Sequence, residues 1–259
     1  MFPSIGADHN VVNGTESGRY LAGPLAITGA VMPMAAGCCQ GDTMQPPEDV
    51  REFVSQHWFE GVPYDAASQY TEEDAKRLLE WLVNDPEKHE EFLPEIVTTL
   101  CFIGSEVAVE PLIDFVESPR AGRAVFNAKN AALIHLGDLI NKSGNQAALD
   151  FLTRVATQMD TARALAEPQT HAEAAEAIGG VVAPTVEALG AELAVSATFG
   201  LSLAGTPDAE KTIHRLRDDP NAFASVNQAA AEAAEISRAV RAQGQKEYYR
   251  RKPEDRERQ

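Results

Sequence analysis

The strongest constraint on the fold is a helix–glycine–helix pattern that occurs twice between Phe92 and Thr153. In each copy, apolar residues recur at the three- and four-residue steps that define one face of an α-helix. The first copy has Leu93, Ile96, Val97, Leu100 and Ile103 before Gly104-Ser105, and Val109, Leu112, Ile113 and Val116 after it. The second has Leu133, Leu136 and Ile140 before Gly144-Asn145, and Ala148, Leu149, Leu152 and Val155 after it. Both stretches predict a hairpin of two amphipathic helices.

Each predicted turn joins a glycine to a residue that can cap a helix. The glycine suits a left-handed helix end, and the next side chain can accept a hydrogen bond from a backbone N–H of the second helix. A third copy of the spacing follows, in which a glycine, a capping residue, a small residue and an aliphatic residue recur. The six residues predicted to form these structural turns are Gly104, Ser105, Gly144, Asn145, Gly205 and Thr206.

An amphipathic helix pair cannot bury its apolar stripe alone, so such pairs stack on one another. We therefore predict an all-α fold, a short α-solenoid of antiparallel helix pairs over residues 48–244. The interval between the second and third turns fits neither one repeat nor two, and residues 168–190 are predicted to form an abbreviated pair around Gly179-Gly180. A long helix from Asn221 to Ala242 would cover the last apolar face.

The segment Ala108-Val109-Glu110-Pro111-Leu112-Ile113 resembles the start of the second helix in HEAT or HEAT-like repeats. The spacing from Gly104 to Gly144 matches the period of about 40 residues that is typical of such repeats. The resemblance implies a right-handed array with one concave and one convex face. Within this segment, Pro111 is expected to kink the second helix or to remove one of its hydrogen bonds.

The first 37 residues are predicted to be a signal-like or unstructured leader. From Tyr20 to Gly37 the chain has no charged residue, and it ends in Ala35-Ala36-Gly37-Cys38. This ending is similar to the lipobox of bacterial lipoproteins, in which small residues precede a cysteine that becomes acylated after cleavage. The resemblance implies that Cys38 is lipidated and that residues 38–47 form a tether. The alternative, an unprocessed leader in a cytoplasmic protein, stays open.

The net charge of −17, from 39 acidic and 22 basic residues, disfavours binding to nucleic acid or to anionic lipid headgroups, both of which need clustered Lys and Arg. Membrane contact is therefore expected only through a lipid anchor. The expected partner is a protein, with basic character favoured by the charge. The remaining cysteine outside the Cys38-Cys39 pair, Cys101, lies on an apolar helix face and is expected to be a buried hydrophobe.

The usual motifs of catalysis, phosphate binding and metal binding are missing from the sequence. The six histidines are scattered, and His135 and His214 are expected to be packing or hydrogen-bonding residues. A HEAT-repeat hydroxylase family binds iron through several His-Glu pairs, whereas this chain has the one pair His89-Glu90. We therefore predict no catalytic residues, no cofactor and no metal site.

Residues 245–259 carry charges of both signs and almost no aliphatic side chain, so a solvated tail is predicted. The alternative is that this segment contacts an acidic surface, such as the protein's own body, with Tyr248 and Tyr249 as anchors.

These observations predict a non-enzymatic, protein-binding scaffold that is anchored at the envelope of a bacterial cell through an acylated cysteine. Two alternatives remain: a soluble cytoplasmic HEAT-like interaction module, and an accessory subunit of an enzyme, for example a lyase-like HEAT protein.

Overall fold

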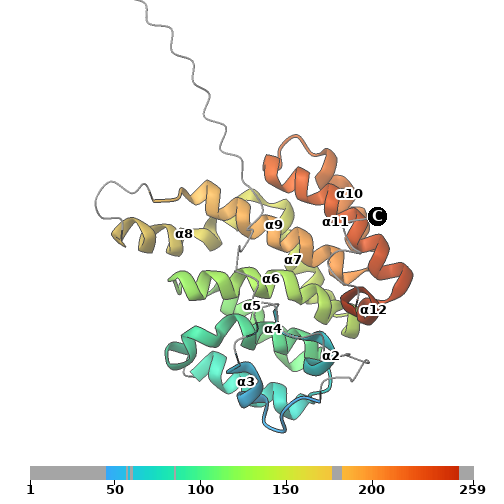
Figure 1. Cartoon of the computed structure of the whole chain (residues 1–259). Coiled ribbons are helices and arrows are strands. Elements are labelled where there is room, and N and C mark those ends of the chain that lie inside the picture. The colour runs from blue at the N-terminus through green and yellow to red at the C-terminus, as the bar shows by residue number, and fades with distance from the viewer. Residues whose placement is uncertain (1–44, 57, 59–60, 85, 177–182, 251–259) are drawn as a thin grey trace, which may run out of the picture. The chain divides into compact units, whose positions relative to one another are not determined.

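The computed structural model describes residues 45–56, 58, 61–84, 86–176 and 183–250, and these residues form helices and turns without a β-strand (Figure 1). The prediction of an all-α fold is therefore confirmed for this part of the chain. The elements are α1 (Val50–Val54), α2 (Tyr64–Ala67), α3 (Glu72–Asn84), the 3₁₀ helix η1 (Pro86–Phe92), α4 (Leu93–Ile103), the 3₁₀ helix η2 (Glu106–Ala108), α5 (Val109–Glu117), α6 (Arg123–Ser143), α7 (Gln146–Thr157), α8 (Met159–Glu176), α9 (Val186–Ala204), α10 (Pro207–Asp218), α11 (Ala224–Gln243) and α12 (Gln245–Arg250).

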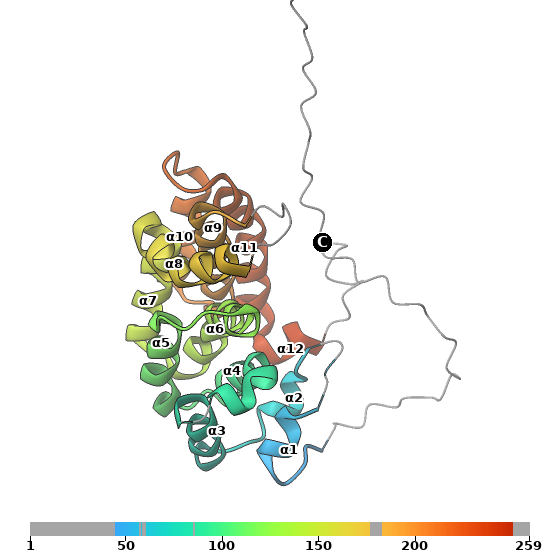
Figure 2. The same cartoon turned by 90° about the vertical axis from the view of Figure 1, so that its left-hand side faces the viewer.

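The helices pack in two layers within this unit. In one layer α4 lies against α6, α6 against α9, and α9 against α11 (Figures 1 and 2). The second layer contains α5, α7 and α10, which pack on the first layer and on one another. Their amphipathic patterns supply the apolar residues buried between the layers. The exposed faces of α5, α7 and α10 therefore form one continuous side of the unit.

The three glycine turns each end a helix in the left-handed conformation. The φ angles are 75° at Gly104, 68° at Gly144 and 61° at Gly205. Asn145 and Thr206 accept hydrogen bonds from the N–H groups of Ala148 and Ala209 at 3.1 and 3.2 Å. These two side chains satisfy backbone donors that would otherwise lack an intrahelical partner.

The first turn differs from the other two, because the Ser105 side chain makes no capping bond. Its hydroxyl instead lies 3.4 Å from a carboxylate oxygen of Glu72 on α3. The short helix η2 separates Ser105 from α5, so the expected helix cap is wrong at this turn. The insertion also explains Pro111, which falls in the first turn of α5 rather than in its interior. An N–H in the first turn has no intrahelical acceptor, so the expected kink does not arise.

Residues 168–176 and 186–190 belong to two long helices rather than to the abbreviated pair that was predicted. Residues 168–176 are the second half of α8, which contains Pro168, and α9 begins at Val186. Gly179-Gly180 lie outside the described residues. The two helices α8 and α9 pack on each other, so a helix pair is present here but is longer than predicted.

Residues 245–250, predicted to belong to a solvated tail, instead form the helix α12. Gly244 ends α11 with a φ of 81°, and the N–H of Tyr248 donates to its carbonyl oxygen at 3.1 Å. The helix packs on α11 and α2. The alternative of a contact with the body of the protein therefore describes these residues, whereas residues 251–259 lie outside the described part.

The helix α9 is apolar enough and long enough to cross a membrane by composition alone. Here it is the central core helix, because it packs on α6, α7, α8, α10 and α11. About 61% of its most apolar window is buried by these neighbours. The apolar character of α9 is therefore explained by burial within the protein.

The backbones of α6 and α9 come into direct contact at Gly137 and Gly200. A Cβ atom on Gly137 would lie 1.9 Å from the carbonyl oxygen of Gly200. A Cβ atom on Gly200 would lie 2.1 Å from the carbonyl oxygen of Leu133. Real Cβ atoms do not approach other heavy atoms to less than 3.0 Å, so this crossing requires glycine at both positions.

Replacing Gly200 with alanine is expected to lower the free energy of unfolding by about 3 kcal/mol, because the added methyl group would force α6 and α9 apart. Urea denaturation followed by circular dichroism measures this loss. The matched control is Gly144→Ala, whose Cβ would meet no atom within 4 Å. Its left-handed backbone alone should lower stability by about 1–2 kcal/mol. Equal losses in the two variants would contradict the importance of the crossing.

Candidate functional site

The predicted turn residues lie at helix ends and serve packing. Beside Gly104, the Lys142 ammonium of α6 donates to the carbonyl oxygen of Phe102. Beside Gly205, the Asn141 amide of the same helix donates to the carbonyl oxygen of Ala204 at 3.1 Å. The final turn of α6 thus supplies donors to the C-terminal carbonyl groups of both α4 and α9. The predicted lipidation residue, Cys38, lies outside the described residues.

A cluster of ionisable side chains surrounds Asp138, a fully buried residue of α6. The Tyr249 hydroxyl on α12 donates to this carboxylate, at 3.0 Å from one oxygen and 2.9 Å from the other. The Gln245 amide, also on α12, donates to Oδ1. His135 Nδ1 lies 2.8 Å from Oδ2 and must carry its proton, because a carboxylate can only accept. Three neighbouring side chains thus donate hydrogen bonds to the Asp138 carboxylate.

Aromatic rings enclose this carboxylate. The Tyr64 ring of α2 stacks on Tyr249 with centroids 4.9 Å apart, and the Phe102 ring of α4 meets both rings edge-on. The Tyr64 hydroxyl donates to the Gln245 side-chain oxygen at 3.0 Å. The Lys142 ammonium lies 4.9 Å from the centroid of the Tyr64 ring. The cluster therefore joins four helices that are far apart in the sequence: α2, α4, α6 and α12.

The electrostatics of the cluster keep its weak acids protonated. Burial, and then the carboxylates of Asp138 and Asp65, raise the pKa of Tyr64 to about 12. Burial and Asp138 also raise the pKa of Tyr249 well above its usual range. The same two causes raise the pKa of the buried Cys101 thiol, which is therefore not an activated nucleophile. Protonated Tyr249 donates to Asp138 and protonated Tyr64 donates to Gln245, and a substrate cannot reach the carboxylate while α12 covers it.

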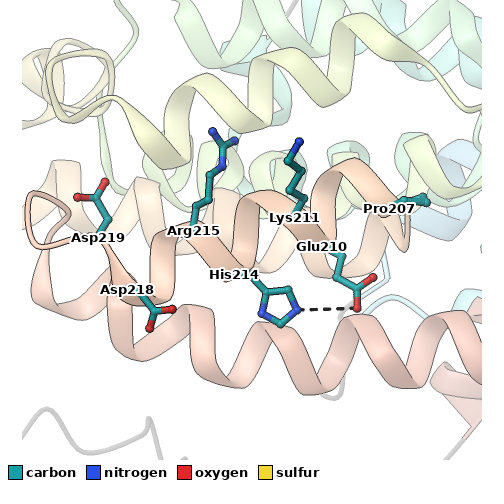
Figure 3. Close-up of a pocket in the computed structure, with 7 residues that line it drawn as sticks. All are labelled: Pro207, Glu210, Lys211, His214, Arg215, Asp218 and Asp219. Carbon is teal, nitrogen blue, oxygen red and sulfur yellow. Dashed lines mark ion pairs between the residues drawn. The ribbon is translucent and has the colours of Figure 1, made fainter.

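A second candidate lies on the surface, at an open hollow of about 730 Å³ along α10 (Figure 3). His214 Nε2 lies 4.0 Å from a Glu210 carboxylate oxygen there. Figure 3 shows Lys211 and Arg215 projecting from the opposite side of α10 to these two residues. The lining residues are Pro207, Glu210, Lys211, His214, Arg215, Asp218 and Asp219.

The hollow adjoins a groove of about 260 Å³ between α7 and α10, and Lys211 and Arg215 line both. We call this the α7–α10 groove; its other lining residues are Gln146, Leu149, Asp150, Thr153, Asp208 and Thr212. Within the described ranges, neither Lys211 nor Arg215 forms an ion pair, and Arg215 donates to the Thr212 hydroxyl at 3.2 Å. Other exposed cations nearby are paired, since Arg217 binds Asp218 at 2.9 Å. The groove therefore presents two cations that form no ion pair with the described residues, and two carboxylates, those of Asp150 and Asp208, line it as well.

The structure shows the surroundings of two single residues that the sequence analysis named, Cys101 and His135. Cys101 is fully buried, as predicted. His135 is a hydrogen-bonding and packing residue, and its ring meets Phe102 edge-on at 4.9 Å. No group of three His, Cys, Asp or Glu side chains in the described part of the chain is placed to hold a metal ion.

Sequence reasoning missed Asp138 and the α7–α10 groove. A signal existed for Asp138, because a lone carboxylate interrupts the apolar residues at the end of α6. The four-residue spacing of Lys211 and Arg215 also places two cations on one helix face. The sequence could not show that α12 covers Asp138, or that α7 borders the groove in which Lys211 and Arg215 lie.

No protein-family model, curated protein or solved structure matches this chain. A functional proposal therefore rests on the residues of the chain itself.

Tyr64→Phe is expected to reduce the loss of stability at high pH. The tyrosine pKa is near 10 in the unfolded chain and about 12 in the folded protein. The folded state therefore holds the proton more tightly, and stability is complete below pH 10 and falls as the pH rises toward 12. Urea denaturation at pH 9 and pH 11 should show a smaller fall for the variant than for the wild type. An equal fall in both proteins would contradict the assignment.

Proposed function

We propose that this protein is a non-enzymatic scaffold of the HEAT-like type, which binds a protein segment in the α7–α10 groove. The observation that carries the proposal is the pair Lys211 and Arg215, two cations one helical turn apart that form no ion pair with the Asp150 and Asp208 carboxylates of the same groove. Like charges at this spacing destabilise a helix by about 0.2–0.5 kcal/mol. A carboxylate from a ligand would remove this repulsion and form charge-assisted hydrogen bonds with both side chains.

The charge distribution sets the character of the partner. The net charge of −17 attracts a basic protein over long range and repels nucleic acid. In the groove, Lys211 and Arg215 form no ion pair with the Asp150 and Asp208 carboxylates that also line it, so an acidic side chain of a ligand can still bind between the two cations. We therefore propose a segment that is basic overall and places one Asp or Glu side chain between Lys211 and Arg215.

The packing of the helices supports a scaffold role, because it leaves the faces of α5, α7 and α10 available along one side of the unit. Within the described ranges, Val83 is the one large hydrophobic side chain that is classed as exposed. The proposed contact is therefore polar rather than a docking of apolar surfaces.

The double variant Lys211→Ala, Arg215→Ala is expected to weaken partner binding at least about tenfold, which corresponds to the loss of one charge-assisted contact. Full-length chains would be used for affinity capture from host-cell extract, with quantitative mass spectrometry of the bound proteins. The control is Arg217→Ala, Arg238→Ala, which removes two cations that already pair with Asp218 and Glu235. Identical capture by both double variants would reject the groove as the binding site.

We also propose that the scaffold is anchored in a bacterial cell envelope through acylated Cys38, on the strength of the lipobox-like sequence Ala35-Ala36-Gly37-Cys38. Several acyl chains would hold it firmly, whereas one gives only marginal binding.

Metabolic labelling with an alkyne fatty acid in a bacterial host is expected to label the wild-type chain and the Cys39→Ser control, but not Cys38→Ser. Mass spectrometry would identify Cys38 as the new N-terminus. An unlabelled, full-length and soluble chain would instead favour the cytoplasmic interaction module.

A further inference from the structure

We propose that two copies of this chain exchange α12, so that the α12 helix of each copy occupies the binding surface of the other. We call this surface the α12 seat; it consists of Tyr64, Asp65, Phe102, His135 and Asp138. The seat has no residue in common with the α7–α10 groove, so the inference goes beyond the proposed function and does not depend on it.

The seat is built to recognise particular side chains of α12. Asp138 is fully buried and receives hydrogen bonds from Gln245 and Tyr249. If α12 leaves, His135 remains as the one described donor to this carboxylate. A buried carboxylate with unsatisfied acceptors is strongly unfavourable, so the seat requires an occupant that supplies an amide and a phenol.

The rim of the seat selects for positive charge. Asp65 lies 2.9 Å from Arg250 Nε and 3.7 Å from Lys246 Nζ. These three side chains are partly or largely exposed, so the pairs contribute little stability but distinguish a basic segment from an acidic one. A second copy of the chain carries the full set of required groups, because its own α12 has the same sequence.

The way α12 is attached favours exchange. The sequence of α12 contains no aliphatic residue beyond those of Lys and Arg stems, so polar and aromatic contacts hold it rather than a buried aliphatic face. A six-residue helix is not stable by itself and must be either seated or unfolded. Both the closed and the exchanged arrangement satisfy this requirement with the same contacts.

A single residue, Gly244, connects α11 to α12. Its φ of 81° reverses the chain so that α12 can return to its own seat. A Cβ atom at this position would meet no other atom within 4 Å, so only the backbone conformation opposes a side chain there. Short hinges of this kind promote domain swapping, because the closed form depends on one unusual backbone conformation.

The balance between the two forms depends on protein concentration. In a single chain the short connection gives α12 a high effective concentration at its own seat, so the closed monomer is favoured in dilute solution. Exchange creates no new class of contact and is favoured only as the concentration rises. Gly244→Ala penalises the left-handed hinge and so destabilises the closed form alone.

The first test is the mass of full-length Gly244→Ala, measured by size-exclusion chromatography with light scattering over a range of concentrations. The exchanged dimer contains two hinges, one from each chain. We expect each Gly244→Ala hinge to lower the dimer dissociation constant by about tenfold relative to the wild type. Adding Tyr249→Ala to the same chain should abolish this dimer. Glu247→Gln, which changes an exposed residue of α12, should leave it unchanged.

The second test uses charge reversal at the rim, which changes no buried residue. One full-length chain carries Asp65→Lys, and the other carries Lys246→Glu and Arg250→Glu. In each chain alone, residue 65 and the α12 residues opposite it carry charges of the same sign. Exchange of α12 between the two chains places opposite charges together at both seats. We expect native mass spectrometry to detect a heterodimer after mixing and no comparable dimer of either chain alone.

The outcomes are decisive in both tests. If the mixed chains keep only the masses of their monomers, and Gly244→Ala dimerises no more than the wild type, exchange of α12 is rejected. A dimer that persists in the Tyr249→Ala background uses another surface and rejects it equally. Loss of partner binding in the Lys211 and Arg215 variant has no bearing on these results, so failure of one proposal is distinguishable from failure of the other.

Discussion

The direct backbone contact between α6 and α9 determines how the rest of the described unit is arranged. Because Gly137 and Gly200 have no side chains, the backbones of α6 and α9 meet directly at this crossing. This places the far end of α6 where its last turn can serve both neighbours, through Lys142 toward α4 and Asn141 toward α9. A larger residue at the crossing would disturb these contacts as well, because rigid helices transmit a separation at one point along their length.

Burial of Asp138 is the second organising feature, and its role differs from that of a catalytic acid. A carboxylate in an open cleft with access to solvent and substrate would suggest proton transfer. Here two tyrosines, an amide and an imidazole surround the group, and the tyrosine hydroxyls stay protonated. The cluster therefore specifies which segment packs at this place. Such use of a buried polar group to select one packing arrangement is known from other folds.

Local rules of the sequence predicted the hairpins and two of the three capped turns, because a glycine followed by Asn145 or Thr206 acts within one helical turn. The rules failed at Ser105, where a contact with Glu72 on another helix replaced the cap. They failed again for α8, whose apolar pattern is interrupted by Pro168. The largest omissions were Gly137, Gly200 and Asp138, whose roles depend on partners 60 or more residues away in sequence and are invisible to periodicity. For residues 245–250, the alternative prediction named Tyr249 as an anchor, whereas nothing in the charged composition indicated that Gln245 contacts the core.

The hydrogen bond from Tyr64 to Gln245 joins positions 181 residues apart and so connects the first part of the described unit to its last helix. In an open stack of helix pairs, each pair contacts only its neighbours, and the ends can fray independently of the middle. With α12 seated, the beginning and the end of the unit share one cluster on α6. Fraying from either terminus must then break contacts that belong to both, which couples the melting of the two ends to that of the centre.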